Sequence, residues 1–169
     1  MKFDAVFDYL IVGGGSAGCV LAYRLTEDGD NKVCLLEAGP RDAWWNWKIH
    51  MPAALMYNLM DDKYNWYYHT EPQPYMNDRV MYWPRGRVLG GSSSLNAMVY
   101  IRGHALDYDR WAFKEGCAGW SYQEILPYFK RAEHRELGGD DYHGDQGPLW
   151  VHTGNQPNPL FEAFVEAAQ

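Results

Sequence analysis

Residues 13–18, GGGSAG, constrain the fold of this chain more than any other stretch. An apolar run over Phe7–Val12 precedes the glycines, and a pattern with helical spacing follows from Ser16 to about Glu27. A second apolar run, over Lys32–Leu36, comes after a polar turn. Short apolar runs of this kind are typical of buried strands. The order predicts a βαβ unit with two parallel strands.

The spacing of three of these glycines is that of a dinucleotide-binding turn. Gly13 permits the tight turn, Gly15 lets the backbone approach a pyrophosphate, and Gly18 lets helix and strand pack closely. The N-terminus of the following helix presents free N–H groups to the phosphates. Glu37 ends the second strand, where its carboxylate can accept both hydroxyls of an adenosine ribose. The alternative is a plain strand–turn–helix in which Glu37 is an ordinary surface residue.

The rest of the chain predicts further elements around a long irregular region. Residues 39–81 are predicted to be mostly loop with short helices. Ser121 and Glu124 have the spacing of a capping box, and the helix that it opens should run to about His134. Pro127 lies past the first turn of that helix and predicts a kink or a later start. We also expect a helix at 105–114, a strand at 148–152 and a helix that begins at Asn158 and Pro159.

Nothing in the sequence marks the end of that last helix. It runs to Gln169 without the glycine, proline or basic residue that usually accompanies a helix C-terminus. We therefore expect the sequence to be the N-terminal portion of a longer protein.

The composition excludes several kinds of partner. A net charge of −7 without a basic stripe argues against nucleic acid, whose phosphates require a basic face. The sequence has no secretory signal, and no apolar stretch approaches the roughly 20 residues of a spanning helix. The three cysteines lack metal-type spacing, and Cys19 and Cys34 are expected to be small buried hydrophobic residues. We expect a soluble or peripheral protein in a reducing compartment, without a metal site.

A second glycine-serine loop lies in residues 86–103, GRVLGGSSSLNAMVYIRG. Gly90 and Gly91 allow backbone amides to come close to a bound dinucleotide, and Ser92 and Ser93 can donate hydroxyl hydrogen bonds to anionic oxygens. Together with the first loop, this stretch resembles the glucose–methanol–choline oxidoreductase family of flavoenzymes, over essentially the whole chain. The resemblance implies an α/β, Rossmann-like FAD-binding domain that is incomplete without downstream segments. Residues 1–169 would form its N-terminal part, with about 148–169 leading into a substrate domain.

The candidate cofactor-binding residues come from both loops. The spacing of the glycines indicates some of these residues. The resemblance adds further residues, whose side chains would line the flavin. It also places Leu95 where several members of the family carry a histidine bonded covalently to the flavin, so FAD is expected to be held non-covalently. The complete set is Gly13, Gly15, Ser16, Ala17, Gly18, Glu37, Val88, Gly91, Ser92, Ser93, Asn96, Ala97, Met98 and Val99.

The resemblance implies oxidation of a primary alcohol, with hydride transfer to the N5 atom of the flavin. Choline would be the substrate and betaine aldehyde the product, and electrons would leave to a membrane quinone rather than to NAD. The location would be the cytoplasm or the periphery of the inner membrane. The base that accepts the alcohol proton lies downstream in this family, so no catalytic residue is expected in this chain. Two alternatives stay open: another alcohol, aliphatic or aromatic, and a non-catalytic FAD-binding fragment.

The histidines and the clustered aromatic residues are expected to be structural. The six histidines have no spacing that suggests a metal site or a catalytic triad. The stretches WWNW and YNWYYHT could contribute an aromatic wall for a quaternary ammonium ion through cation–π contacts. Ring packing within the flavin domain is the interpretation that we favour for them.

Overall fold

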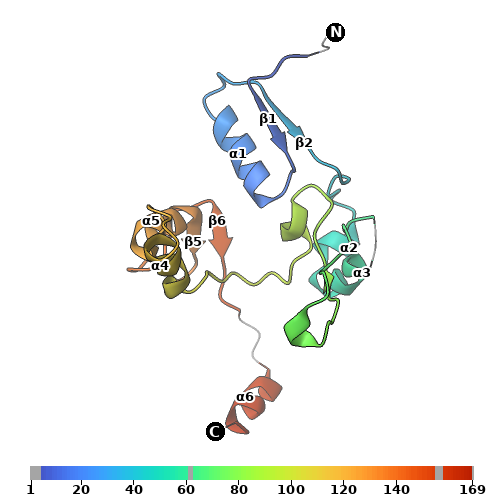
Figure 1. The fold of residues 1–169 in the computed structure, drawn as a ribbon, viewed down its shortest axis with the longest axis vertical. Coiled ribbons are helices and arrows are strands. Elements are labelled where there is room, and N and C mark those ends of the chain that lie inside the picture. Colours follow the sequence, from blue (N-terminus) through green and yellow to red (C-terminus); the bar gives the residue numbers. More distant parts are fainter. Residues whose placement is uncertain (1–4, 61–62, 155–157, 169) are drawn as a thin grey trace. The chain divides into compact units, whose positions relative to one another are not determined.

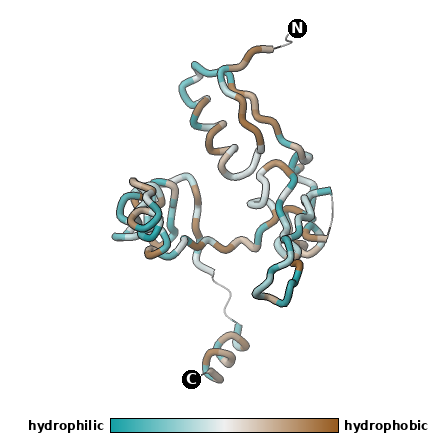
Figure 2. The backbone as a smooth tube through the Cα atoms, viewed as in Figure 1, coloured by the Kyte–Doolittle hydropathy of each residue, from teal (hydrophilic) through white to brown (hydrophobic). Residues whose placement is uncertain are grey.

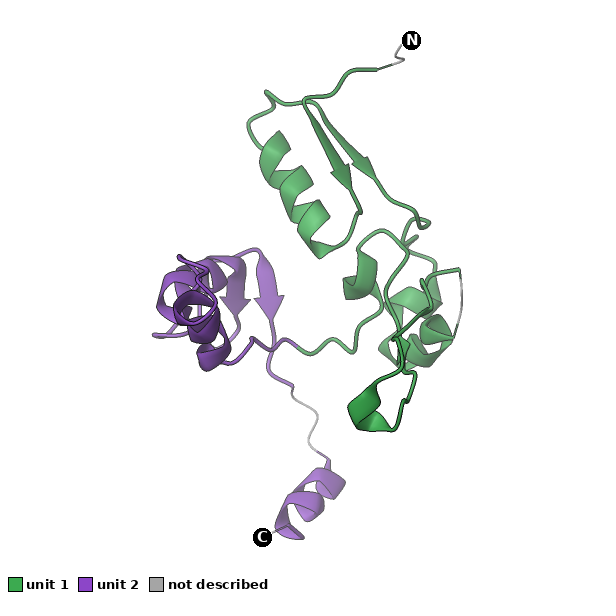
Figure 3. Cartoon of the chain, viewed as in Figure 1, with its two compact units in different colours: residues 1–99 green, residues 100–169 purple. Residues whose placement is uncertain are grey.

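The computed structural model describes residues 5–60, 63–154 and 158–168. The chain divides into two compact units, unit 1 over Met1–Val99 and unit 2 over Tyr100–Gln169 (Figure 3). The predicted division, with a change near residue 148, is a different one and stays a prediction.

Unit 1 begins with the predicted βαβ arrangement (Figure 1). Strand β1 (Tyr9–Val12) leads through the glycine turn into helix α1 (Ser16–Thr26), and the chain returns as strand β2 (Val33–Leu36). The strands are parallel, in a register that pairs each residue of β1 with its counterpart in β2. Both strands are strongly hydrophobic (Figure 2), as expected for strands of a parallel sheet. The predicted α/β unit is confirmed.

Much of the apolar surface of this unit has no cover within the described residues. Val12 at the end of β1 is 82% exposed, and Val20 and Leu21 on the predicted apolar face of α1 are exposed as well. Cys19 and Cys34 were expected to be buried and are half-buried, because the same surface is open. The described part of the chain therefore builds only a small core around this sheet.

The irregular region carries short helices, as the sequence predicted. Helices α2 (Trp47–His50) and α3 (Leu55–Leu59) flank a 3₁₀ turn that starts at Pro52. Strands β3 (Tyr68–His69) and β4 (Tyr82–Trp83) form a short antiparallel hairpin that was not predicted.

A small core of unit 1 lies beneath the second glycine loop. Tyr64, Val88 and Leu95 are buried against one another, and Ile49 of α2 packs on them. Val88 is completely buried, and Asn46 Nδ2 donates to the Tyr64 hydroxyl at 2.8 Å. This cluster fixes the position of the loop relative to α2.

The described residues of unit 2 form three helices and a two-stranded parallel sheet. Helix α4 (Ala105–Phe113) precedes helix α5 (Tyr122–Ala132), and strands β5 (Glu133–Arg135) and β6 (Leu149–Val151) pair in parallel. Helix α6 (Pro159–Glu166) is capped by Asn158, whose Oδ1 accepts the N–H of Leu160 at 3.0 Å. The predicted helices near 105–114 and after 158, and the strand near 149, are confirmed. No helix of the described residues is long and apolar enough to cross a bilayer.

For helix α5 the predicted capping box is confirmed, whereas the later start that Pro127 suggested is wrong. The capping box is present, since the Ser121 backbone N–H donates to Glu124 Oε2 at 3.1 Å, and the helix begins before Pro127 rather than at it. It ends at Ala132, whereas the sequence suggested His134. Residues 133–135 instead pair with β6, so an interaction distant in sequence decides their conformation.

A buried carboxylate at the start of β5 joins three segments of unit 2. The Glu133 side chain is 1% exposed and accepts hydrogen bonds from Arg102 Nη2, from His143 Nδ1 at 3.0 Å and from the N–H of Gly144 at 3.2 Å. Burial by itself would raise the pKa of Glu133. The hydrogen bonds and the positive charge of Arg102 outweigh burial and hold the pKa below its ordinary value.

We expect Glu133→Gln to lower the free energy of unfolding at neutral pH by about 3 kcal/mol, because the buried Arg102 charge loses its partner. A lowered pKa in the folded state means that the stabilisation is complete above the ordinary carboxyl pKa of about 4.3. It is lost as the pH falls through the lowered value. Urea unfolding at several pH values should show the difference between variant and wild type shrinking in acid. Glu115→Gln, at an exposed ion pair, is the control and should change little. A difference that is constant from pH 7 to strong acid would contradict this role.

Candidate functional site

The two glycine loops of unit 1 are joined through their backbones. The N–H of Gly90 donates to the carbonyl oxygen of Gly14 at 2.7 Å. The hydroxyl oxygens of Ser16 and Ser93 lie 2.5 Å apart. The segments predicted separately from the sequence therefore form one site.

This contact requires residues without side chains. A Cβ atom on Gly91 would stand 2.8 Å from the Cα of Gly15, and one on Gly18 would stand 1.9 Å from the carbonyl oxygen of Gly13. The second distance supports the sequence argument that Gly18 allows close packing of helix and strand. Gly15 is different, since its nearest neighbour on the Cβ side is the Cα of Gly91 at 3.9 Å. Its missing side chain leaves open space, as expected for a backbone that a ligand approaches.

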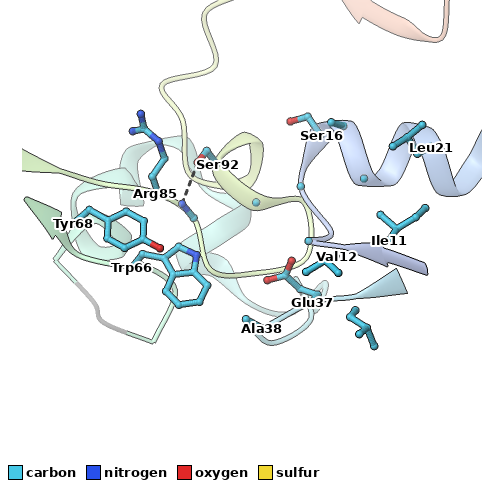
Figure 4. A pocket seen from close by; sticks show the side chains of 17 residues that line it. Ile11, Val12, Ser16, Leu21, Glu37, Ala38, Trp66, Tyr68, Arg85 and Ser92 are labelled. Carbon is cyan, nitrogen blue, oxygen red and sulfur yellow. Dashed lines mark hydrogen bonds between the residues drawn. The ribbon is translucent and has the colours of Figure 1, made fainter. Parts of the chain in front are cut away.

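A cavity of about 910 Å³ lies along the two loops (Figure 4). Eight of the predicted cofactor-binding residues line it, namely Gly13, Gly15, Ser16, Ala17, Gly18, Glu37, Gly91 and Ser92. Gly86 N–H donates to Ser92 Oγ at 3.1 Å, which fixes that hydroxyl at the wall. The size is within the range of about 300–1,000 Å³ that is usual for ligand pockets.

Glu37 ties the first loop to the end of β2. Its Oε2 accepts the N–H of Gly14 at 2.6 Å and its Oε1 accepts the N–H of Gly39 at 2.8 Å. A carboxylate has about four acceptor positions, so each oxygen can accept one more hydrogen bond. The carboxylate is thus held in place and can still accept the two hydroxyls of a ribose.

The electrostatics of the cavity favour an anion at the first loop. Gly15 stands at the N-cap of α1 and supplies no side-chain acceptor, so the N–H groups of the first turn remain available. The helix dipole adds a partial positive charge there. Arg85 also lines the cavity, but its guanidinium lies 5.3 Å from the Trp83 ring and donates from Nη1 to the carbonyl oxygen of Pro84 at 2.7 Å. The uncapped end of α1 is therefore the feature of this cavity that suits a phosphate group.

The remaining predicted residues lie elsewhere in unit 1. Ser93, Asn96 and Met98 line a second cavity of about 290 Å³. Asn96 and Ala97 line a third, of about 340 Å³. The buried side chain of Val88 belongs to the core, whereas Val99 is 73% exposed. Of the predicted residues in the second loop, only Gly91 and Ser92 line the first cavity. The others line two smaller cavities, lie in the core or are exposed.

Met98 has a strained backbone conformation next to these cavities. Its φ of +60° lies in the left-handed region, which residues other than glycine rarely adopt. Its N–H donates to Asn96 Oδ1 at 2.9 Å. This hydrogen bond helps to hold the segment in its left-handed conformation, which the sequence analysis did not predict.

Two aromatic residues of the cavity wall belong to the stretch YNWYYHT, for which the sequence analysis favoured ring packing over a role in a site. The rings of Trp66 and Tyr68 are stacked with centroids 6.0 Å apart and planes 3° apart, and the guanidinium of Arg87 lies 5.5 Å from the Trp66 ring. Figure 4 shows both rings on the side of the cavity that lies away from α1. Their alternation in sequence is a weak signal, because it places them on one side of an extended segment but does not say what they face.

The histidines have structural contacts. His104 Nδ1 accepts the N–H of Leu106 at 3.2 Å at the start of α4, and the His134 ring stacks on Trp150 with centroids 3.7 Å apart. His143 binds the buried Glu133. No group of three or more His, Cys, Asp or Glu side chains among the described residues is placed to hold a metal ion.

Residues 7–169 match the family model described as GMC oxidoreductase. The chain therefore belongs to the GMC oxidoreductase family, and its fold is that of part of the N-terminal FAD-binding domain of this family.

Curated relatives narrow the comparison within the family. The chain is 62% identical over 168 residues to the mitochondrial choline dehydrogenase of Mus musculus, and 59% identical to that of Homo sapiens. It is 56% identical over 162 residues to the oxygen-dependent choline dehydrogenase of Paraburkholderia phymatum. These alignments cover 95–96% of this chain but only 28% of each relative. The chain thus spans less than a third of their length.

Solved structures agree on the fold. A pyridoxine 4-oxidase from Mesorbium loti superposes with a TM-score of 0.83 at 45% identity, over 95% of this chain and 31% of that enzyme. A formate oxidase superposes with a TM-score of 0.81 at 30% identity, over 99% of this chain and 30% of that enzyme.

We expect Gly15→Val to lose dinucleotide binding and Gly18→Val to lose stability. Valine at position 15 enters open space beside the loop and should leave a folded protein that has lost its dinucleotide. Valine at position 18 would collide with the Gly13 carbonyl oxygen and should destabilise the βαβ unit itself. Nucleotide released on heating measures the first effect and thermal unfolding the second. Full nucleotide content in folded Gly15→Val would show that nothing binds against this loop.

Proposed function

We propose that this chain supplies the FAD-binding part of an alcohol-oxidising flavoenzyme. The observation that carries the proposal is the pair of glycine loops, joined by the Gly90–Gly14 hydrogen bond, beside a cavity that contains Glu37. The first turn of α1 would bind the pyrophosphate, and Glu37 would accept the ribose hydroxyls. The stacked rings of Trp66 and Tyr68 offer a flat apolar surface at the same cavity.

The second loop would hold the flavin ring. In this proposal, Gly91 to Ser93 bind through backbone amides and hydroxyls, and residues 96–99 lie along the ring. FAD, when bound, supplies the hydride acceptor, while the protein supplies position and electrostatics. The group that accepts the alcohol proton lies outside this chain.

Choline is the substrate that the relatives favour, with betaine aldehyde as the product. The support is the identity of 54–62% to proteins named choline dehydrogenase from mammals and bacteria. A second candidate is an aromatic alcohol, which the 45% identity to a pyridoxine 4-oxidase favours. The two share the flavin chemistry and differ in the charge and shape of the substrate.

The electron acceptor is proposed to be a membrane quinone rather than NAD. A protein that delivers electrons there would be cytoplasmic or bound peripherally to the inner membrane. The name of the bacterial relatives contains "oxygen-dependent", so oxygen is the alternative acceptor to compare.

We expect the complete protein to oxidise choline with a kcat/KM at least tenfold above that for pyridoxine. A panel of alcohols with an artificial dye as acceptor gives this ratio, and a soluble quinone and oxygen then replace the dye. Gly15→Val is the control without cofactor. A preference for pyridoxine would favour an aromatic alcohol as the substrate. If neither choline nor pyridoxine were oxidised, both proposed substrates would be contradicted.

We also expect FAD to be held without a covalent bond. The support is Leu95, whose buried aliphatic side chain has no nucleophilic atom to bond a flavin. Acid precipitation of the purified holoprotein should leave the yellow colour in the supernatant, because every remaining contact disappears on unfolding. A yellow pellet that contains a peptide with the added mass of the flavin would overturn this expectation.

A further inference from the structure

Asn58, on helix α3, has a buried side chain with one unused hydrogen-bonding atom. The residue is 1% exposed. Its Nδ2 donates to the carbonyl oxygen of Lys48, whereas its Oδ1 has no hydrogen-bond partner in the described part of the chain. Buried polar atoms are paired in the great majority of cases, so an unpaired amide oxygen calls for a partner.

The orientation of this amide is fixed by its own contact. Exchanging its oxygen and nitrogen would place Oδ1 against the carbonyl oxygen of Lys48, so that two acceptors would face each other. The neighbouring polar side chains also have partners of their own. Ser94 Oγ donates to the carbonyl oxygen of Leu89 at 3.0 Å, and Asn96 Oδ1 accepts the N–H of Met98 at 2.9 Å. The missing donor for Asn58 must therefore come from something that enters the site.

Asn58 lines the cavity of about 290 Å³ that also contains part of the second glycine loop. Its lining combines apolar side chains, three titratable side chains and residues of the second loop, namely Ile49, Met51, Pro52, Leu55 and Leu95, then Asp42, Lys48 and His50, and Ser93, Ser94, Asn96 and Met98. The volume lies at the lower limit for ligand pockets, so it suits one planar ring system better than a whole dinucleotide.

We propose that Asn58 positions the flavin ring, with Oδ1 accepting a hydrogen bond from the ring N3–H. The inference rests on the proposed function, because it uses Ser93, Asn96 and Met98 as flavin contacts. N3–H is the one N–H donor of an oxidised isoalloxazine ring, so a hydrogen bond to Oδ1 would fix how the ring lies in this cavity.

The test compares FAD with N3-methyl-FAD, which lacks this donor, in binding to the complete apoprotein. Wild-type protein should bind FAD about tenfold more tightly than the analogue, the usual effect of one hydrogen bond. Asn58→Leu keeps the volume but removes the acceptor. It should weaken FAD binding to the level of the analogue, so that the preference disappears.

Asn58→Asp is the matched variant, because a buried carboxyl group that is protonated can donate to the carbonyl oxygen of Lys48 and still present an acceptor oxygen, so it should retain the preference for FAD. Thermal unfolding and circular dichroism identify the variants that fold, and each comparison uses two ligands on one protein, so a uniform loss of stability does not mimic the result. An unchanged preference in Asn58→Leu would overturn the proposal and assign Oδ1 to a buried water. Failure of wild-type protein to bind either ligand would instead contradict the proposed function.

Discussion

In unit 1 the main chains of residues 13–18 and 86–94 touch directly, and the site depends on this contact. Gly91 has no space for a side chain because the Cα of Gly15 lies against it, and Gly90 donates to the carbonyl oxygen of Gly14. Beneath the contact, Val88 and Leu95 anchor the second loop in the small core. The same contact brings the open end of α1 and the wall with Arg85 to one cavity. Without it, the two loops would not line one cavity.

Glu37, which we propose binds the ribose, also has a structural role. Its two oxygens hold the N–H groups of Gly14 and Gly39, so the carboxylate is fixed before any ligand arrives. A side chain that is already ordered loses little conformational entropy on binding, and this favours affinity. The residue that the sequence assigned to a ribose is therefore also a part of the loop that surrounds it.

The sequence predicted what is local and missed what depends on distant contacts. The βαβ unit and its glycines follow from periodicity and spacing within about thirty residues. Glu133 at the start of β5 was read as helical, because its conformation depends on pairing with β6. The stretch that contains Trp66 was interpreted as ring packing, and Asn58 was not singled out, since only the folded chain shows that Trp66 lines the cavity and that the Asn58 oxygen is unpaired. The glycine loops were recognised because only glycine fits where two backbones lie in close contact, so the structural requirement is visible in the sequence.

The separation of the two loops along the chain has a consequence for biosynthesis. Residues 86–94 leave the ribosome well after residues 13–18, and the hydrogen bond between Gly90 and Gly14 cannot form before then. A nascent chain that ends before the second loop has the first glycine turn but not the wall with Gly91 and Ser92. Closing so long a loop is entropically costly, so the contact is expected to form late among the folding events of unit 1. Nucleotide capture would then report that synthesis has passed the second loop, and translation order would set the earliest moment of cofactor loading.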